Sequence, residues 1–156
     1  MREGLSSLAI IHVFYVILMV KMRVLFVCTH NSARSQMAEG FLRHLYGDRY
    51  EAYSAGTKPS HLNPYAVRVM AEVGVDISQH RSKGLDEFQG WKFDYVVTVC
   101  DQAKEECPFF PGGGMRLHKS FMDPSELEGG EEEKLRVFRR VRDEIKEWVE
   151  EVFGNG

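Results

Sequence analysis

The chain has 156 residues, which is enough for one domain with a sizeable core, and 44% of them are hydrophobic. The net charge is −3 and no long basic run is present, so the sequence gives no reason to expect a nucleic-acid partner. Three cysteines are too few for a secreted, disulfide-stabilised scaffold and favour a reducing compartment, where cysteines are more often catalytic or metal-binding. We therefore expect a cytoplasmic protein.

Residues 1–21 do not share the pattern of the rest of the chain. Residues 8–20 form an apolar run that only His12 interrupts. A bilayer span needs about 20 apolar residues, so this run is too short to cross a membrane. It resembles the core of a signal peptide, but no small-x-small cleavage site follows it. We expect that Met22 is the natural start, with a membrane-associated segment as the alternative, and that residues 22–156 form a single domain.

Strand and helix patterns alternate from residue 22 onward, which is typical of an α/β fold with a parallel sheet. Apolar segments predict four strands, at residues 23–27, 51–54, 93–99 and 115–118. Amphipathic periodicity and capping signals predict three longer helices, at residues 35–46, 63–74 and about 132–152, and a short helix at 101–106. Ligands of such sheets bind beyond the carboxyl ends of the strands, so the residues that follow the strands are the candidates for a site.

The segment from Cys28 to Ser35 joins the first strand to the first long helix. It begins with a cysteine and has an arginine, Arg34, six residues later. A helix N-terminus carries a partial positive charge and unpaired N–H donors, so a loop at this place binds oxyanions and favours the thiolate form of a cysteine. Arg34 adds a planar fork of donors that suits a tetrahedral anion. The loop residues expected around the anion are Thr29, His30, Asn31, Ser32, Ala33, Arg34 and Ser35.

Cys28 could instead be a buried structural cysteine, because free cysteine is among the most buried residue types. Its place at the end of a strand, together with Arg34, favours a catalytic nucleophile that acts on a phosphate-like substrate. We interpret His30 as a loop residue and not as a base, since the helix terminus already stabilises a thiolate. Asn31 is open to a structural interpretation, because asparagine tolerates the left-handed conformation of a turn.

The other two cysteines, Cys100 and Cys107, are separated by six residues. Cys100 follows the second strongly apolar strand, which we expect beside the strand that ends at Cys28. A metal site has little support, because no C-x2-C pair is present and His118 lies too far along the chain for a recognisable zinc pattern, so we expect no metal. Two buried structural thiols are another interpretation, which suits Cys100 better than Cys107.

A redox-active pair is the third interpretation of Cys100 and Cys107. If residues 101–106 are helical, the rise of about 1.5 Å per residue puts the two Cα atoms roughly 10 Å apart. A disulfide requires a Cα–Cα distance of about 7 Å or less. A disulfide between these cysteines therefore requires the short helix to unwind.

Asp123 precedes Pro124 in a loop after the fourth strand, at the same edge of the sheet. Most Asp-Pro pairs only start turns. As a functional residue, Asp123 would protonate a leaving oxygen at the anion site, which requires a partly desolvated carboxyl group.

With these residues in place, the chain resembles the thioredoxin-coupled arsenate reductases of the low-molecular-weight protein tyrosine phosphatase superfamily. The resemblance runs from Met22 to about Val152. It rests on residues 28–40, 53–57, 63–64, 75–80, 123–124 and 138–145 and on the pair Cys100 and Cys107. It implies a three-layer α/β sandwich in which helices flank a four-stranded parallel sheet.

The resemblance also implies a mechanism. Cys28 attacks arsenate held by the loop amides and Arg34, while Asp123 helps a hydroxyl group or water to leave. Cys100 then attacks the sulfur of the arseno-Cys28 adduct and releases arsenite, and Cys107 attacks Cys100. A thioredoxin-like dithiol reduces the resulting Cys100–Cys107 disulfide. We expect no bound cofactor, a monomer and no membrane partner.

Three residues depart from patterns found in some members of the superfamily. Ala33 replaces a second loop cysteine, which the three-thiol relay does not need, and His30 replaces a glycine. Lys83 replaces an aspartate near a potassium site that in those members uses the counterparts of Asn31, Glu39 and Ser54. We hypothesise that the Lys83 ammonium group takes the place of the cation beside Glu39.

The main alternative function is that of a low-molecular-weight protein tyrosine phosphatase, which uses Cys28, Arg34 and Asp123 but forms a phosphocysteine that water hydrolyses. Such phosphatases usually have aromatic residues after the Asp-Pro pair, whereas Ser125 and Glu126 follow here. This difference favours the reductase. A non-catalytic oxyanion-binding or redox-sensing module is a second alternative.

Overall fold

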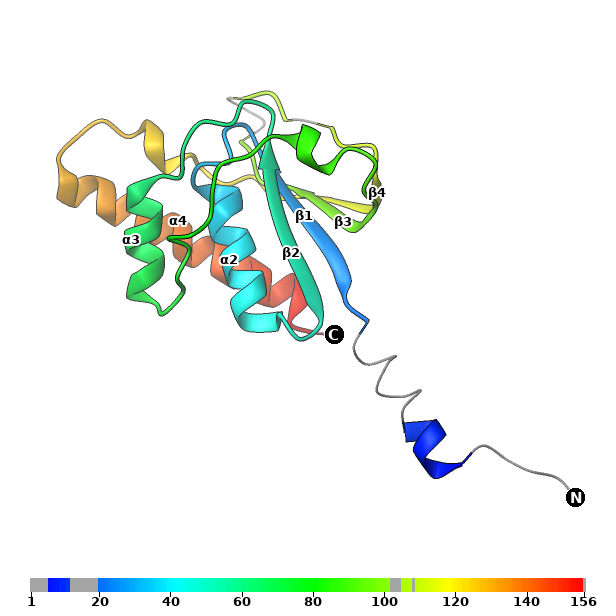
Figure 1. The fold of residues 1–156 in the computed structure, drawn as a ribbon. Coiled ribbons are helices and arrows are strands. Elements are labelled where there is room, and N and C mark those ends of the chain that lie inside the picture. The colour runs from blue at the N-terminus through cyan, green and yellow to red at the C-terminus, as the bar shows by residue number, and fades with distance from the viewer. Residues whose placement is uncertain (1–5, 12–19, 102–104, 108, 156) are drawn as a thin grey trace, which may run out of the picture.

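The computed structural model describes residues 6–11, 20–101, 105–107 and 109–155. Its centre is a sheet of four parallel strands in the order β2-β1-β3-β4 (Figure 1). The strands are β1 (Met22–Cys28), β2 (Tyr50–Gly56), β3 (Phe93–Thr98) and β4 (Gly113–His118). The strand that ends at Cys28 therefore lies beside β3, as the sequence predicts.

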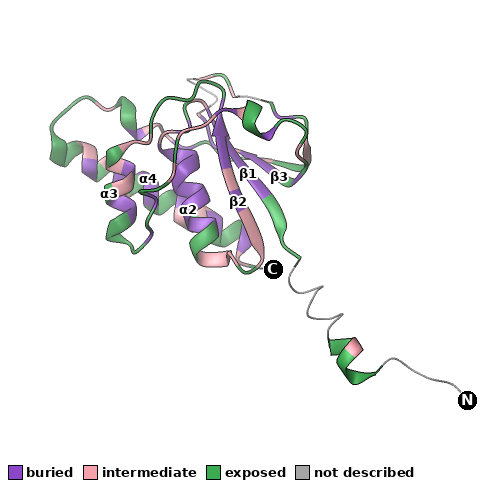
Figure 2. Ribbon diagram, in the orientation of Figure 1, coloured by how far each residue is buried: buried purple, intermediate pink, exposed green. Residues whose placement is uncertain are grey.

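Three α-helices cover one face of the sheet: α2 (Arg34–Tyr46), α3 (Pro64–Glu72) and α4 (Glu131–Phe153) (Figure 1). Side chains alternate between the two faces of a strand, so Val24 and Phe26 pack in the same core cluster as the helices, whereas Leu25 packs on the other face. Figure 2 shows that buried residues run along β1 and most of α2. This packing fixes the loop between β1 and α2.

The other face of the sheet is covered by the 3-10 turn η1 (Leu85–Phe88) and an aromatic cluster. The rings of the cluster meet mostly edge to face, at centroid distances of 5.2 to 6.0 Å, and belong to Tyr53, Phe88, Trp91, Phe93 and Phe110. The expected α/β fold with a four-stranded parallel sheet is confirmed, and this third layer is thinner than the helical one.

Most expected elements are present with small shifts of their ends. The helix expected at 63–74 ends at Glu72, and Gly74 follows it with a positive φ of 80°. Of the short helix expected at 101–106, Asp101, Glu105 and Glu106 are not helical, although the N–H of Glu105 donates to the carbonyl of Asp101 at 2.9 Å, and residues 102–104 lie outside the described residues.

Residues 7–11 form a short helical segment whose first turn is capped by Ser6, and Leu8 and Ile11 on it are exposed. Most of the apolar run expected at 8–20 lies outside the described residues, since 12–19 are among those not described. Within the described part of the chain, no helix is both long and apolar enough to span a bilayer. The start of the protein at Met22 stays a prediction.

Candidate active site

The thiol of Cys28 lies at the bottom of the loop that joins β1 to α2. Cys28 is a free, buried cysteine whose Sγ is 2.9 Å from the Oγ of Ser35. The backbone N–H of Asn31 also points at this sulfur, with an N···S distance of 3.3 Å. The loop therefore surrounds the sulfur with hydrogen-bonding groups, an arrangement that suits a nucleophilic thiolate.

Asn31 holds the loop in shape. Its φ of 49° is in the left-handed region, which confirms the structural interpretation of this residue. Its side-chain amide donates to Ser35 Oγ at 2.8 Å, and its Oδ1 accepts from Gln36 Nε2 at 2.9 Å and from the backbone N–H of Lys83 at 3.0 Å. Asn31 is fully buried, so these bonds lock the conformation around the thiol.

The guanidinium group of Arg34 lies at the same place and is 3% exposed. It forms an ion pair with Glu105, donates to the carbonyl of Phe121 at 3.3 Å, and has its Nη2 3.5 Å from Asp123 Oδ2. Burial by itself lowers the pKa of Arg34, but the bond to Glu105 and nearby negative groups outweigh it and raise the pKa. Arg34 is thus a permanently charged group, and it lines the same hollow as Cys28.

Glu105 is a site residue that the sequence analysis did not predict. Its carboxylate accepts from both terminal nitrogens of Arg34, from Thr29 Oγ1 at 2.8 Å and from the backbone N–H of Asp101 at 2.8 Å. Burial acts to raise the pKa of Glu105, but these hydrogen bonds outweigh it and lower the pKa to about 2. The sequence has three acidic residues between the two downstream cysteines, Asp101, Glu105 and Glu106, and no local signal distinguishes Glu105 from the other two.

The side chain of Asp123 caps a turn and also faces Arg34. Its Oδ1 accepts from the N–H and the hydroxyl of Ser125, at 3.0 and 2.7 Å, and so caps the 3-10 turn η2 (Pro124–Glu126). Its Oδ2 faces Arg34. One carboxyl oxygen therefore starts a turn, while the other faces the arginine, so the turn interpretation is confirmed and the role as a proton donor stays a prediction.

A small hollow of about 20 Å³ lies between these groups. Its lining comes from the loop and from the turn at Asp123, and consists of Cys28, His30, Ser32, Ala33, Arg34, Asp123 and Ser125. His30 is exposed, and its Nδ1 donates to the carbonyl of Lys58 at 3.0 Å, as expected of a loop residue. The expected residues Cys28, Arg34 and Asp123 thus meet around one hollow.

Cys100 and Cys107 form a disulfide with a Cα–Cα distance of 5.9 Å. Cys100 is completely buried, whereas Cys107 is half-buried. Cys28 ends β1 and Cys100 follows β3. Because these strands are paired, and the N–H of Val99 donates to the carbonyl of Val27 at 3.0 Å, the two cysteines lie at the same edge of the sheet. The helical spacing of roughly 10 Å does not apply in this disulfide state.

His118 lies near the disulfide, although the sequence separates it widely from both cysteines. Its nearest ring nitrogen and the two sulfurs are all within 4.8 Å of one another. Its two ring nitrogens lie 2.6 Å from Thr98 Oγ1 and 2.9 Å from Ser120 Oγ. Because both sulfurs are in the disulfide and both ring nitrogens have hydroxyl partners, these three residues do not offer a metal site in this state.

The ammonium group of Lys83 lies beside Glu39, as hypothesised. Its Nζ is 3.7 Å from Glu39 Oε1, 3.4 Å from Ser54 Oγ and 3.3 Å from the carbonyl oxygen of Arg81. Burial lowers the pKa of Lys83, and the neighbouring Glu39 carboxylate opposes this effect. A charged nitrogen surrounded by three oxygens has the environment that a bound monovalent cation would have.

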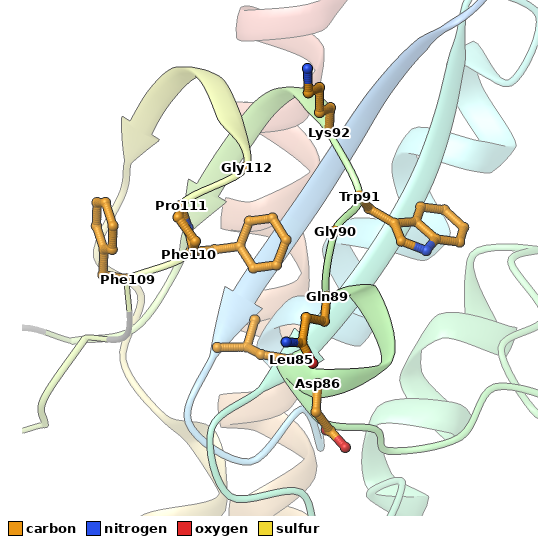
Figure 3. Close-up of a pocket in the computed structure, with 10 residues that line it drawn as sticks. All are labelled: Leu85, Asp86, Gln89, Gly90, Trp91, Lys92, Phe109, Phe110, Pro111 and Gly112. Atoms are coloured by element: carbon orange, nitrogen blue, oxygen red, sulfur yellow. The ribbon is translucent and has the colours of Figure 1, made fainter.

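A separate groove of about 440 Å³ lies on the thin face of the sheet (Figure 3). It is mostly apolar, and Trp91, Phe109 and Phe110 contribute rings to it. Phe109 is 71% exposed and is two residues from Cys107. The groove contains none of the groups at the thiol, so it is not part of the anion site.

A family model described as "Low molecular weight phosphotyrosine protein phosphatase" matches residues 23–155. The chain belongs to this family. Its core, from β1 to α4, is therefore a low-molecular-weight phosphatase fold.

Two curated relatives within the family are named arsenate reductase. The protein from Halalkalibacterium halodurans is 48% identical over 127 residues, which are 81% of this chain and 91% of the relative. The protein from Bacillus subtilis is 45% identical over 133 residues, which are 85% of this chain and 96% of the relative.

Solved structures give the same fold. A structure described as an arsenate reductase in reduced state matches with a TM-score of 0.70 at 34% identity, over 86% of this chain and 98% of that one. A thioredoxin-dependent arsenate reductase from Corynebacterium glutamicum matches with a TM-score of 0.64 at 27% identity, over 95% and 71%. A low-molecular-weight protein tyrosine phosphatase from T. tengcongensis also matches, with a TM-score of 0.64 at 27% identity, over 87% of this chain and 100% of that one.

Proposed function

We propose that this protein reduces arsenate to arsenite through a relay of three cysteines that a thioredoxin-like dithiol regenerates. The observation that carries the proposal is the disulfide between Cys100 and Cys107 at the sheet edge where the free thiol of Cys28 meets Arg34. A phosphatase needs the thiol and the arginine but has no use for this disulfide. The arsenate reductase relatives and a similar structure described as an arsenate reductase in the phosphate binding state support the substrate class.

In the first step, Cys28 attacks the arsenic atom and forms a sulfur–arsenic bond. Arg34 and the loop residues 29–35 hold the oxygens and balance their negative charge. Asp123 faces the arginine with one carboxyl oxygen and gives a proton to the hydroxyl group that leaves as water.

In the second step, Cys100 attacks the sulfur of Cys28. The sulfur–arsenic bond breaks and its electron pair stays on arsenic, so As(V) becomes As(III) and arsenite is released with a Cys28–Cys100 disulfide left behind. Cys107 then attacks Cys100, and Cys28 leaves as a thiolate. The product of this exchange, a Cys100–Cys107 disulfide beside a free Cys28, has the covalent state of the structure. A dithiol donor supplies the two electrons that reopen the disulfide.

The remaining features of the proposal follow from the same chemistry. Residues 22–156 form the catalytic domain, and the relay needs no bound cofactor or metal, since thiols carry both electrons. We expect a cytoplasmic monomer with an oxyanion substrate, a thioredoxin-like partner and no nucleic-acid partner.

The second candidate is phosphotyrosine phosphatase activity, which family membership and the shared Cys28, Arg34 and Asp123 favour. The turn after Asp123 argues against it as the main activity, because Ser125 and Glu126 provide no aromatic wall for a phosphotyrosine ring. We expect only weak phosphatase activity from the shared chemistry.

The test is arsenate turnover with thioredoxin, thioredoxin reductase and NADPH, for the wild type and for Cys28→Ser, Cys100→Ser and Cys107→Ser. We expect multiple turnovers only in the wild type, and release of a single arsenite per chain by Cys107→Ser. Full arsenate turnover by Cys100→Ser would contradict the relay, and retained function in Cys28→Ser would point to a non-catalytic redox module.

A further inference from the structure

The carboxylate of Glu105 and the Cys100–Cys107 disulfide belong to the same short segment. We infer that Glu105 is an internal ligand of the oxyanion site, which occupies Arg34 while the disulfide is closed and competes there with the oxyanion. The inference deepens the proposed function. It rests on that function in one respect only, namely that Arg34 is the group that binds the oxyanion.

Glu105 is bound as a substrate oxyanion would be. Nη2 of Arg34 donates to Oε1 at 3.0 Å, and Nη1 donates to Oε2. Paired donation from a guanidinium fork to two oxygens is the geometry with which arginine binds carboxylates and phosphates alike. The same two oxygens accept from Thr29, the first loop residue after the thiol, and from the backbone N–H of Asp101. The side chain of Glu105 is 18% exposed, so these bonds are partly shielded from water.

The site has little room and little positive charge in this state. The hollow beside Cys28 is small, with a volume of about 20 Å³. Arg34 also faces two carboxylates, those of Glu105 and Asp123, so a dianion would meet net negative charge there.

The disulfide holds Glu105 in this position through the chain. Glu105 is two residues from Cys107, and the disulfide keeps the Cα atoms of Cys100 and Cys107 5.9 Å apart. Opening the disulfide removes that constraint and lets the segment take other conformations, in which Glu105 leaves Arg34. Oxyanion binding thus becomes coupled to the redox state: the site accepts a new substrate after the dithiol donor has acted.

A different role for Glu105 predicts the opposite result. If the carboxylate only oriented Arg34 for the substrate, its removal would weaken oxyanion binding. If it competes with the substrate, its removal strengthens binding. The sign of the change therefore distinguishes a competing ligand from a positioning residue.

The experiment is calorimetric titration of inorganic phosphate into the full chain. It compares the wild type, Glu105→Gln and the matched control Glu106→Gln, whose side chain is exposed and whose change in net charge is the same. Each protein is measured reduced and as the Cys100–Cys107 disulfide, which is verified by counting one free thiol per chain. In the disulfide form we expect Glu105→Gln to bind phosphate at least about tenfold more tightly than the wild type. If Glu105 occupies Arg34 in about nine-tenths of the wild-type molecules, only about one-tenth of them can bind phosphate, which weakens the apparent affinity about tenfold. The gain is smaller in the reduced form, and Glu106→Gln behaves as the wild type.

Unchanged or weaker binding by Glu105→Gln in the disulfide form would overturn the inference, and so would an equal gain in both redox states. Absence of phosphate binding to the reduced wild type would overturn both this inference and the proposed anion site. If the expected binding pattern is found but reduced wild type fails to turn over arsenate, the proposed function falls and the role of Glu105 stands. If arsenate is turned over but the binding pattern is not found, the proposed function stands and the role of Glu105 falls.

Discussion

The Nζ of Lys83 lies 3.7 Å from Oε1 of Glu39, a carboxylate that is 4% exposed. Ser54 donates to the same oxygen at 2.7 Å, and Arg43 donates to the other oxygen at 3.0 Å. Two cationic side chains, those of Lys83 and Arg43, thus face a buried carboxylate on the helix that follows the loop at the thiol.

We therefore expect the melting temperature and the activity to be the same in potassium and sodium chloride at equal ionic strength. Lys83→Met should lower the free energy of unfolding by about 1–3 kcal/mol, because it takes a charged partner from a buried carboxylate. Lys92→Met, which removes an exposed lysine, is the control. Thermal and urea unfolding measure both effects. A marked rise of stability or activity with potassium in the wild type would show that a cation site remains.

Asp123→Asn should lower the turnover number for arsenate by about 10²-fold or more, because an amide cannot protonate the leaving oxygen. The amide oxygen can still accept from Ser125, so the turn and the melting temperature should be preserved. Glu126→Gln is a suitable control, since it changes an exposed carboxyl group in the same turn. Undiminished turnover by Asp123→Asn would remove Asp123 from the mechanism.

The dithiol donor should attack Cys107 and not Cys100, because Cys100 is completely buried and Cys107 is half-buried. A thioredoxin variant without its second cysteine should therefore be trapped as a mixed disulfide with Cys107. Peptide mapping of the trapped complex identifies the sulfur. A predominant link to Cys100 would mean that the segment opens before the donor attacks.

The acid stability of the disulfide form should depend on Glu105. Its pKa is lowered from 4.5 to about 2 in the folded protein. Between these pH values the carboxyl group is therefore protonated in the unfolded chain and ionised in the folded one. The stabilisation is complete above about pH 4.5 and is lost as the pH falls toward 2. Stability measured by urea unfolding should therefore fall more steeply over this range in the wild type than in Glu105→Gln. Parallel curves for the two proteins would show that the carboxylate contributes nothing to folding.

Much of the fold follows from local signals in the sequence. The side chain of Asn63 accepts from the N–H of Tyr65 at 2.8 Å, so the capping signal for α3 is confirmed. The apolar strand that ends at Cys28 and the helix that begins at Arg34 also lie where their patterns predict. Such signals act within one turn or one strand, where covalent spacing decides which groups can meet.

The segment between Cys100 and Cys107 is where local reasoning failed. Its polar residues suit a short helix, but the described residues of the segment are not helical. Two interactions that helix propensity does not take into account compete with the helix. One is the disulfide between the two ends of the segment, and the other is the pair of bonds from Glu105 to Arg34, which is 71 residues away. Tertiary interactions of this kind override helix propensities of a few tenths of a kcal/mol per residue.

The sequence by itself determined which groups can carry out the chemistry: a thiol and a guanidinium group on one loop, two further thiols, and a carboxyl group before a proline. Only the tertiary structure decided which groups meet. The parallel pairing of β1 with β3 brings the segment after Cys100 to the loop after Cys28. The carboxylate of Glu105, which lies on that segment, thereby forms hydrogen bonds with Arg34. A charge–charge contact acts over a few ångströms of space regardless of separation along the chain, so no sequence spacing could reveal it.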